Sequence, residues 1–218
     1  MEREYWLNRW LENRTGFHLN GVNPLLERFW PQVAEPGDRR ILVPLCGKSE
    51  DLRWLADRGY EVTGVELSPV AVKAVAAEQG IEFTETEQPP FTLFRANRIA
   101  WYVGDVFEFT ADIGGRFDVV YDRAALIALP PTMRPGYARQ LQSLMMLQAR
   151  MLLISLEYDT SAMEGPPFSV PEGDVRELFP DFQVAKLHEY DCLDDEPRFK
   201  ERGVRWMREI VYKVSPRS

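Results

Sequence analysis

The sequence predicts an α/β fold built on a doubly wound, mostly parallel sheet. From residue 36 onward, short apolar segments alternate with stretches of helical periodicity, which is typical of parallel strands joined by helices. The last two apolar segments, 182–190 and 204–214, have no helix between them, so we expect them to pair antiparallel. The length of 218 residues predicts a single domain, with 1–35 as an N-terminal extension and 36–218 as the α/β core.

The N-terminal extension is rich in aromatic residues and predicts two short helices. Trp6 and Trp10 lie four residues apart, on one apolar helical face. A second apolar stripe runs from Leu25 to Trp30, and we expect Pro31 to end its helix. An aromatic segment placed before the core is a candidate lid that excludes water from a ligand.

The elements of the core follow from apolar segments and from the turn and cap residues between them. We expect the residues at 95–98 to join two strands as a hairpin, and Gly80 to end a helix opened by Ser68 and Pro69. The expected strands are 41–44, 60–66, 91–94, 99–103, 117–121, 151–156, 182–190 and 204–214. The expected helices are 50–58, 69–80, 135–150 and 171–179.

Composition and charge exclude several kinds of partner. With 26 Lys and Arg against 34 Asp and Glu, the net charge is −8, and the chain lacks the basic surface that nucleic-acid binding requires. There is no membrane-spanning apolar run and no signal-peptide pattern at the N-terminus. Cys46 and Cys192 are too few for a disulfide framework. We expect a cytoplasmic protein without nucleic-acid or membrane partners, and a monomer because no heptad pattern demands an oligomer.

Ligands of an open α/β sheet bind beyond the carboxyl ends of the strands, so the residues there are the informative ones. Gly47-Lys48-Ser49 follows the first strand but lacks the earlier glycine of a phosphate loop, because position 42 is leucine. The three-glycine fingerprint of dinucleotide-binding folds is also absent, which disfavours a nicotinamide oxidoreductase. Glu66 ends the second strand 19 residues after Gly47, where a carboxylate can accept hydrogen bonds from ribose hydroxyls.

A ribose-binding carboxylate without a phosphate cradle suits a nucleoside that carries no phosphate. S-adenosylmethionine is the commonest such cofactor, and its positive sulfonium is favoured by carboxylates and aromatic faces. Asp105, after the strand at 99–103, is placed to reach the adenine edge. The alternative interpretation of Asp105 is a plain turn aspartate.

Six segments spread over the chain resemble the thiopurine S-methyltransferase family, bacterial type. They are Trp6–Trp10, Thr15–His18, Val43–Lys48, Gly64–Ser68, Tyr121–Leu126 and Gly165–Phe168. The segment Tyr121-Asp122-Arg123 departs from the family in its first residue, where the family has tryptophan. The resemblance implies a class I, Rossmann-like S-adenosylmethionine-dependent methyltransferase. Its expected sheet has seven strands, mostly parallel with the last antiparallel, and the N-terminal segment is expected to be a helical lid.

The resemblance also implies roles for individual residues. The implied cofactor contacts are Trp10, Phe17, Leu45, Glu66, Asp105, Val106 and Arg123. Arg123 and Arg198 match the family's proposed acceptor-site arginines, where a guanidinium would favour the ionised acceptor. Each arginine has a surface salt bridge as its alternative interpretation. The implied activity is methyl transfer to the sulfur of a small-molecule thiol, aromatic or heterocyclic, such as a thiopurine, with selenium or tellurium compounds as further acceptors.

Two other functions stay open at this point. One is methyl transfer to a different acceptor atom, and the other is a non-catalytic domain that binds S-adenosylmethionine. The lack of an obvious base favours sulfur, because thiolates are intrinsically nucleophilic. We expect Cys46 to be a small buried residue rather than a nucleophile, and His18 to pack in the lid or to hydrogen-bond rather than to act as a general base. Two histidines and two distant cysteines predict no metal site.

Overall fold

The computed structural model describes residues 3–16, 18 and 21–217, and the described residues form one nine-stranded sheet. The strands are β1 Arg40–Pro44, β2 Glu61–Glu66, β3 Thr84–Gln88, β4 Phe91–Ala96, β5 Ile99–Val103, β6 Phe117–Arg123, β7 Met145–Tyr158, β8 Phe182–Asp191 and β9 Met207–Pro216. Their spatial order is β3-β4-β5-β2-β1-β6-β7-β9-β8. The run from β5 to β7 is parallel throughout, which confirms the predicted fold class.

The sheet has nine strands rather than the seven that the resemblance implies. The addition is an antiparallel ribbon at one edge, formed by β3 and β4 and joined to β5. Sequence reasoning missed β3 because its residues Thr84–Gln88 are all polar and largely exposed, so no apolar alternation marks them. The hairpin of β4 and β5 is confirmed, and so is the antiparallel last strand, since β9 runs antiparallel to both β7 and β8.

The helices expected from the sequence are present, with two shifted ends, and two short helices, Ala111–Gly114 and Pro197–Lys200, were not predicted. They are α1 Arg3–Leu11, α2 Pro24–Val33, α3 Asp51–Asp57, α4 Pro69–Gln79, α5 Ala111–Gly114, α6 Arg134–Leu144, α7 Glu172–Leu178 and α8 Pro197–Lys200, with 3-10 turns η1 Val106–Glu108, η2 Leu126–Ala128 and η3 Leu193–Asp195. The expectation that Pro31 ends α2 was wrong: the helix continues to Val33, which is fully buried. The helix expected to reach residue 150 ends at Leu144, because Met145 already pairs with β6.

Alternating strand residues build a separate core on each face of the sheet. Leu42 packs on one face, and its neighbours Ile41 and Val43 pack on the other. Helices α2, α3 and α4 cover the face of Ile41, and α6 and α7 cover the face of Leu42. With both faces covered, the strand ends are where the sheet can hold a ligand.

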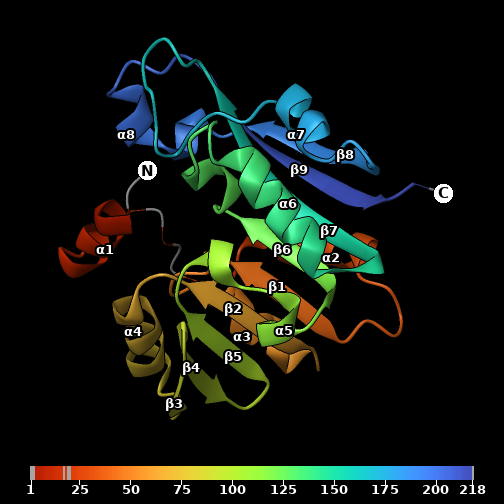
Figure 1. Ribbon diagram of the computed structural model, residues 1–218. Coiled ribbons are helices and arrows are strands. Elements are labelled where there is room, and N and C mark those ends of the chain that lie inside the picture. Colours follow the sequence, from red (N-terminus) through yellow and green to blue (C-terminus); the bar gives the residue numbers. More distant parts are fainter. Residues whose placement is uncertain (1–2, 17, 19–20, 218) are drawn as a thin grey trace.

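The carboxyl ends of the parallel strands face the side of the molecule where α1 and α8 lie. Figure 1 shows the arrowheads of β1 and β2 pointing toward this side. A third apolar cluster, which includes Leu156, Cys192, Phe199 and Met207, fastens η3 and α8 to the ends of β7 and β9. The segment that carries η3 and α8 therefore lies beyond the carboxyl ends of the strands. Helix α1 lies on the same side of the molecule (Figure 1).

Candidate active site

A cavity of about 770 Å³ lies at the carboxyl ends of the central strands. This volume falls within the range of small-molecule and cofactor sites. The cavity is lined from β2, β6, β7, β8 and β9, from the loop after β1, and from α1 and the α8 region. Its lining residues include five of the sequence-predicted ones, namely Trp10, Leu45, Glu66, Arg123 and Arg198.

Glu66 is held at one end of the cavity by the backbone around it. Its Oε2 accepts a 2.8 Å hydrogen bond from the Gly47 N–H, and its Oε1 accepts one of 2.8 Å from the Ser68 N–H. Burial raises the pKa of Glu66 to about 6, although these backbone donors oppose the shift. The two oxygens of a carboxylate together offer about four acceptor sites, so Glu66 keeps the capacity to accept a ligand hydroxyl.

The loop after β1 bends tightly around this carboxylate. Leu45 has a φ of 45° and Gly47 a φ of 55°, both in the left-handed region. A Cβ on Gly47 would lie 3.1 Å from the ring of Trp10, so α1 packs closely on the loop. The sequence-predicted residues Trp10, Leu45 and Glu66 are thus brought together at one end of the cavity.

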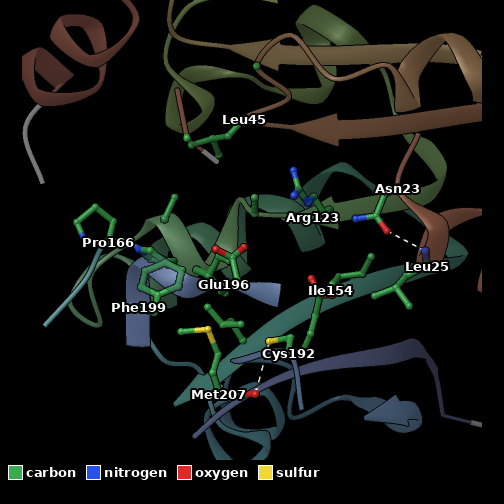
Figure 2. Close-up of a pocket in the computed structure, with 18 of the residues that line it drawn as sticks. Asn23, Leu25, Leu45, Arg123, Ile154, Pro166, Cys192, Glu196, Phe199 and Met207 are labelled. Atoms are coloured by element: carbon green, nitrogen blue, oxygen red, sulfur yellow. Dashed lines mark hydrogen bonds between the residues drawn. The ribbon is translucent and has the colours of Figure 1, made fainter. Parts of the chain in front are cut away.

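Arg123 ends β6 in the middle of the carboxyl edge, and its neighbour Asp122 is buried beneath it. Asp122 accepts hydrogen bonds from the Leu126 N–H at 3.1 Å and from the Tyr137 hydroxyl at 2.8 Å. Burial raises the pKa of Asp122 to about 6. Figure 2 shows Arg123 on one wall of the cavity, with Cys192 and Met207 on another. The buried hydrogen bonds of Asp122 fix the backbone from which Arg123 projects.

Arg198, the second predicted acceptor-site residue, also lines the cavity but has local partners. Its Nε donates to Glu196 at 2.9 Å, and its Nη1 donates to the backbone carbonyl of Gly16. The side chain is 47% exposed. The guanidinium therefore joins the N-terminal segment to the segment that carries α8, a contact that sequence reasoning did not anticipate.

Two predicted residues of the described part of the chain are not brought into this arrangement. Asp105 accepts a 3.0 Å hydrogen bond from the Phe107 N–H and caps η1, while Val106 is buried in the core. Neither is among the residues that line the cavity. Phe17 lies outside the described residues. Gly104, just before Asp105, donates its N–H to the Glu66 carbonyl at 2.9 Å, so this turn lies beside the Glu66 end.

The cavity also has lining residues that sequence reasoning missed. Tyr190 of β8 donates a 2.6 Å hydrogen bond to Glu209 of β9, and both side chains line the cavity. Pro166 and Pro167 line it as well, from the motif that the resemblance quoted. Glu209 comes directly before the apolar run Ile210–Tyr212, which could have indicated an inward-facing polar site, because charged residues are rarely placed on a buried face without a partner.

His18 and Cys46 lie at a smaller pocket that adjoins the cavity. Burial and the charge of Lys48 lower the pKa of His18, and burial raises the pKa of the Cys46 thiol. Among the described residues, no group of three or more His, Cys, Asp and Glu side chains is arranged to bind a metal ion. Nor does the described part of the chain contain a helix with the length and apolarity needed to span a membrane.

Comparison with known proteins places the chain in a family. The sequence model described as Thiopurine S-methyltransferase (TPMT) matches residues 1–217. The thiopurine S-methyltransferase of Bordetella petrii is 45% identical over 215 residues, which cover 98% of each chain. That of Pseudomonas fluorescens is 46% identical over 216 residues, covering 98% of this chain and 99% of the relative.

Solved structures agree on the fold. An S-adenosylmethionine-dependent methyltransferase from Anabaena variabilis superposes with a TM-score of 0.68 at 16% identity, covering 99% of this chain and 95% of its own. A Burkholderia thailandensis 1,6-didemethyltoxoflavin-N1-methyltransferase, solved with its substrate and S-adenosylhomocysteine, gives 0.64 at 17% identity, with coverages of 99% and 87%. The chain belongs to the thiopurine S-methyltransferase family and has the fold of S-adenosylmethionine-dependent methyltransferases, as its sequence motifs predicted.

Proposed function

We propose that this enzyme transfers a methyl group to the sulfur of aromatic and heterocyclic thiols, thiopurines among them, with selenium or tellurium compounds as further acceptors. The observation that carries the proposal is the division of one cavity into two ends. Glu66 and the loop after β1 line one end, and the other end, beyond Arg123, is lined by apolar side chains such as Ile154 and Met207 together with charged ones. Such a cavity can hold a nucleoside cofactor and a flat acceptor together.

S-adenosylmethionine is the methyl donor, and it supplies an electrophilic methyl group on a positive sulfonium. The residues at the Glu66 end fit a nucleoside. Glu66 is positioned to accept hydrogen bonds from ribose hydroxyls, while Leu45 and Trp10 supply apolar surface. Asp105 and Val106 are proposed adenine contacts, since their turn lies next to Glu66.

The acceptor end has the properties that a thiol methyl acceptor needs. Buried Ile154, Leu156 and Met207 line it, and they can pack against an aromatic ring. Transfer from a sulfonium releases a neutral thioether, so no acid is needed to expel the leaving group. The cationic Arg123 favours the thiolate form of the acceptor, and the enclosed geometry can align the two sulfur atoms.

The direct test is to incubate the purified protein with methyl-labelled S-adenosylmethionine and 6-mercaptopurine, and to count the label in the extracted product. We expect labelled thioether from the unaltered protein and at least a tenfold loss with Glu66→Ala. Cofactor binding without transfer to any thiol, selenol or tellurium compound would contradict the proposal. It would favour another acceptor atom or a non-catalytic binding domain.

We also propose that the enzyme acts as a cytoplasmic monomer. Both cysteines are unpaired and buried, which suits a reducing compartment. Size-exclusion chromatography with light scattering tests the oligomeric state, where a mass near 25.3 kDa is expected. A stable dimer at micromolar concentration would contradict this part.

A further inference from the structure

A carboxylate and a phenol form a pair at the acceptor end of the cavity. Tyr190 and Glu209 lie directly opposite each other on the antiparallel strands β8 and β9. The Tyr190 hydroxyl donates to Glu209 Oε2 at 2.6 Å. Among the described residues, Tyr190 is the one hydrogen-bond donor to this carboxylate, so Oε1 keeps its lone pairs for a ligand.

The surroundings of Glu209 combine apolar and charged side chains. Leu156 is its partner on β7, and Cys192 and Met207 line the same part of the cavity. Burial raises the pKa of Glu209, whereas the Tyr190 hydrogen bond and the charge of Arg123 oppose the shift. Asp195 and Glu196 add to the rise through their negative charge. A carboxylate in such surroundings has a raised affinity for a proton or for an N–H donor.

Glu209 is too far from Glu66 to serve the cofactor end. Glu66 is on β2 and Glu209 on β9, and the order β2-β1-β6-β7-β9 puts four strand spacings between them. At about 4.8 Å per spacing, the two strands are roughly 19 Å apart. The two carboxylates therefore mark opposite ends of one cavity.

Heterocyclic thiols differ from simple thiophenols in a way that this carboxylate can recognise. Where a ring nitrogen adjoins the carbon that bears sulfur, the neutral molecule is a thione with an N–H beside the C=S group. We propose that Glu209 is a catalytic residue that accepts this ring N–H and takes its proton as the sulfur is methylated, with Tyr190 as the positioning residue. This inference rests on the proposed function and names the acceptor class that the site favours.

A bond forms between the acceptor sulfur and the methyl carbon, and the bond from that carbon to the sulfonium breaks, leaving its electron pair on the departing sulfur. The ring N–H bond breaks, its electrons stay in the ring, and its proton passes to Glu209. The products are an aromatic thioether, S-adenosylhomocysteine and a protonated carboxyl that loses its proton to water. Without Glu209, the methylated ring would carry a positive charge.

The test compares 2-mercaptopyridine with thiophenol, which has the same ring with carbon in place of nitrogen. With Glu209→Gln, we expect kcat/KM for 2-mercaptopyridine to fall about 100-fold, the lower range for general base catalysis. For thiophenol we expect a change within about threefold, because the thiophenolate has no ring proton to remove. Glu189→Gln is the matched control on β8, since Glu189 pairs with Lys186 and Arg208 and does not line the cavity, so it should change neither rate.

A binding measurement separates recognition from turnover. In the presence of S-adenosylhomocysteine, calorimetry should show that Glu209→Gln lowers the affinity for 2-mercaptopyridine about tenfold. The reason is that a charged hydrogen-bond acceptor is replaced by a neutral one. Thiophenol affinity should not change. Tyr190→Phe should keep the preference for 2-mercaptopyridine over thiophenol but make it smaller, because Glu209 loses the hydrogen bond that orients its carboxylate.

The outcomes distinguish the two proposals. Equal losses on both acceptors, or no loss on either, would overturn the role of Glu209 while leaving thiol methylation intact. If the unaltered enzyme methylates neither thiol, the proposed function fails, and the calorimetric comparison still decides whether Glu209 recognises the ring N–H. Melting temperatures close to that of the unaltered enzyme would show that the variants remain folded.

Discussion

Acidification should weaken cofactor binding through Glu66. Burial raises the pKa of this carboxyl to about 6. Its ionised fraction then falls from about 0.9 at pH 7 to about 0.1 at pH 5. If ribose hydroxyls bind the ionised form, affinity for S-adenosylhomocysteine should fall about tenfold over this range, or about 1.4 kcal/mol. The amino and carboxylate groups of that ligand keep their charges between these pH values.

The assay is calorimetric titration with S-adenosylhomocysteine at pH 5, 6 and 7, on the unaltered protein and on Glu66→Gln. The variant should bind more weakly at pH 7 and should lose the pH dependence assigned to Glu66. Burial lowers the pKa of His18, and any contribution of this residue should be the same in both proteins because it lies in the adjoining pocket. Equal slopes of affinity against pH in the two proteins would refute the reasoning.

Three further predictions concern the N-terminal segment, the two arginines, and the buried hydrogen bond between Tyr121 and Asp51. Deleting residues 1–17 should raise the Kd for cofactor at least 100-fold while circular dichroism still reports a folded sheet; unchanged affinity would refute the lid. Arg123→Ala and Arg198→Ala should each lower thiol turnover about tenfold or more, with the loss relieved at high pH where the thiol ionises unaided; unchanged pH–rate profiles in both would exclude acceptor activation. Tyr121→Phe should lower the free energy of unfolding by about 1–3 kcal/mol in denaturant titrations, because it removes the hydroxyl that donates to buried Asp51 at 3.0 Å; a smaller loss would show that water replaces the donor.

The site at the Glu66 end could be predicted because it depends on local order along the chain. The end of the second strand fixes Glu66, and a loop 19 residues earlier supplies its backbone partner. Both follow from alternating apolar segments and from the rule that ligands bind beyond parallel strand ends. Strand β3 could not be predicted, because its residues are all polar and lie at the edge of the sheet, so no alternation of apolar and polar residues marks it.

The contacts of Arg198, Tyr190 and Glu209 could not be predicted in the same way, because they join residues far apart in the sequence. Arg198 bonds to the Gly16 carbonyl 182 residues away, and nothing in either local sequence indicates this pairing. Tyr190 meets Glu209 only because β8 and β9 pair in one particular register. A shift of one residue would send these side chains to opposite faces.

The hydrogen bond between Arg198 and Gly16 has a consequence for the speed of the enzyme. It joins the N-terminal segment to α8 beside the cavity that both residues line. If ligands enter and leave there, a firmer bond would lengthen the residence time of substrate and product alike. A substitution that strengthens the hydrogen bond of Arg198 would then tighten ligand binding and slow product release together. Because the Arg198 side chain is half-exposed, such a substitution would change kcat without changing the residues that contact the reacting atoms.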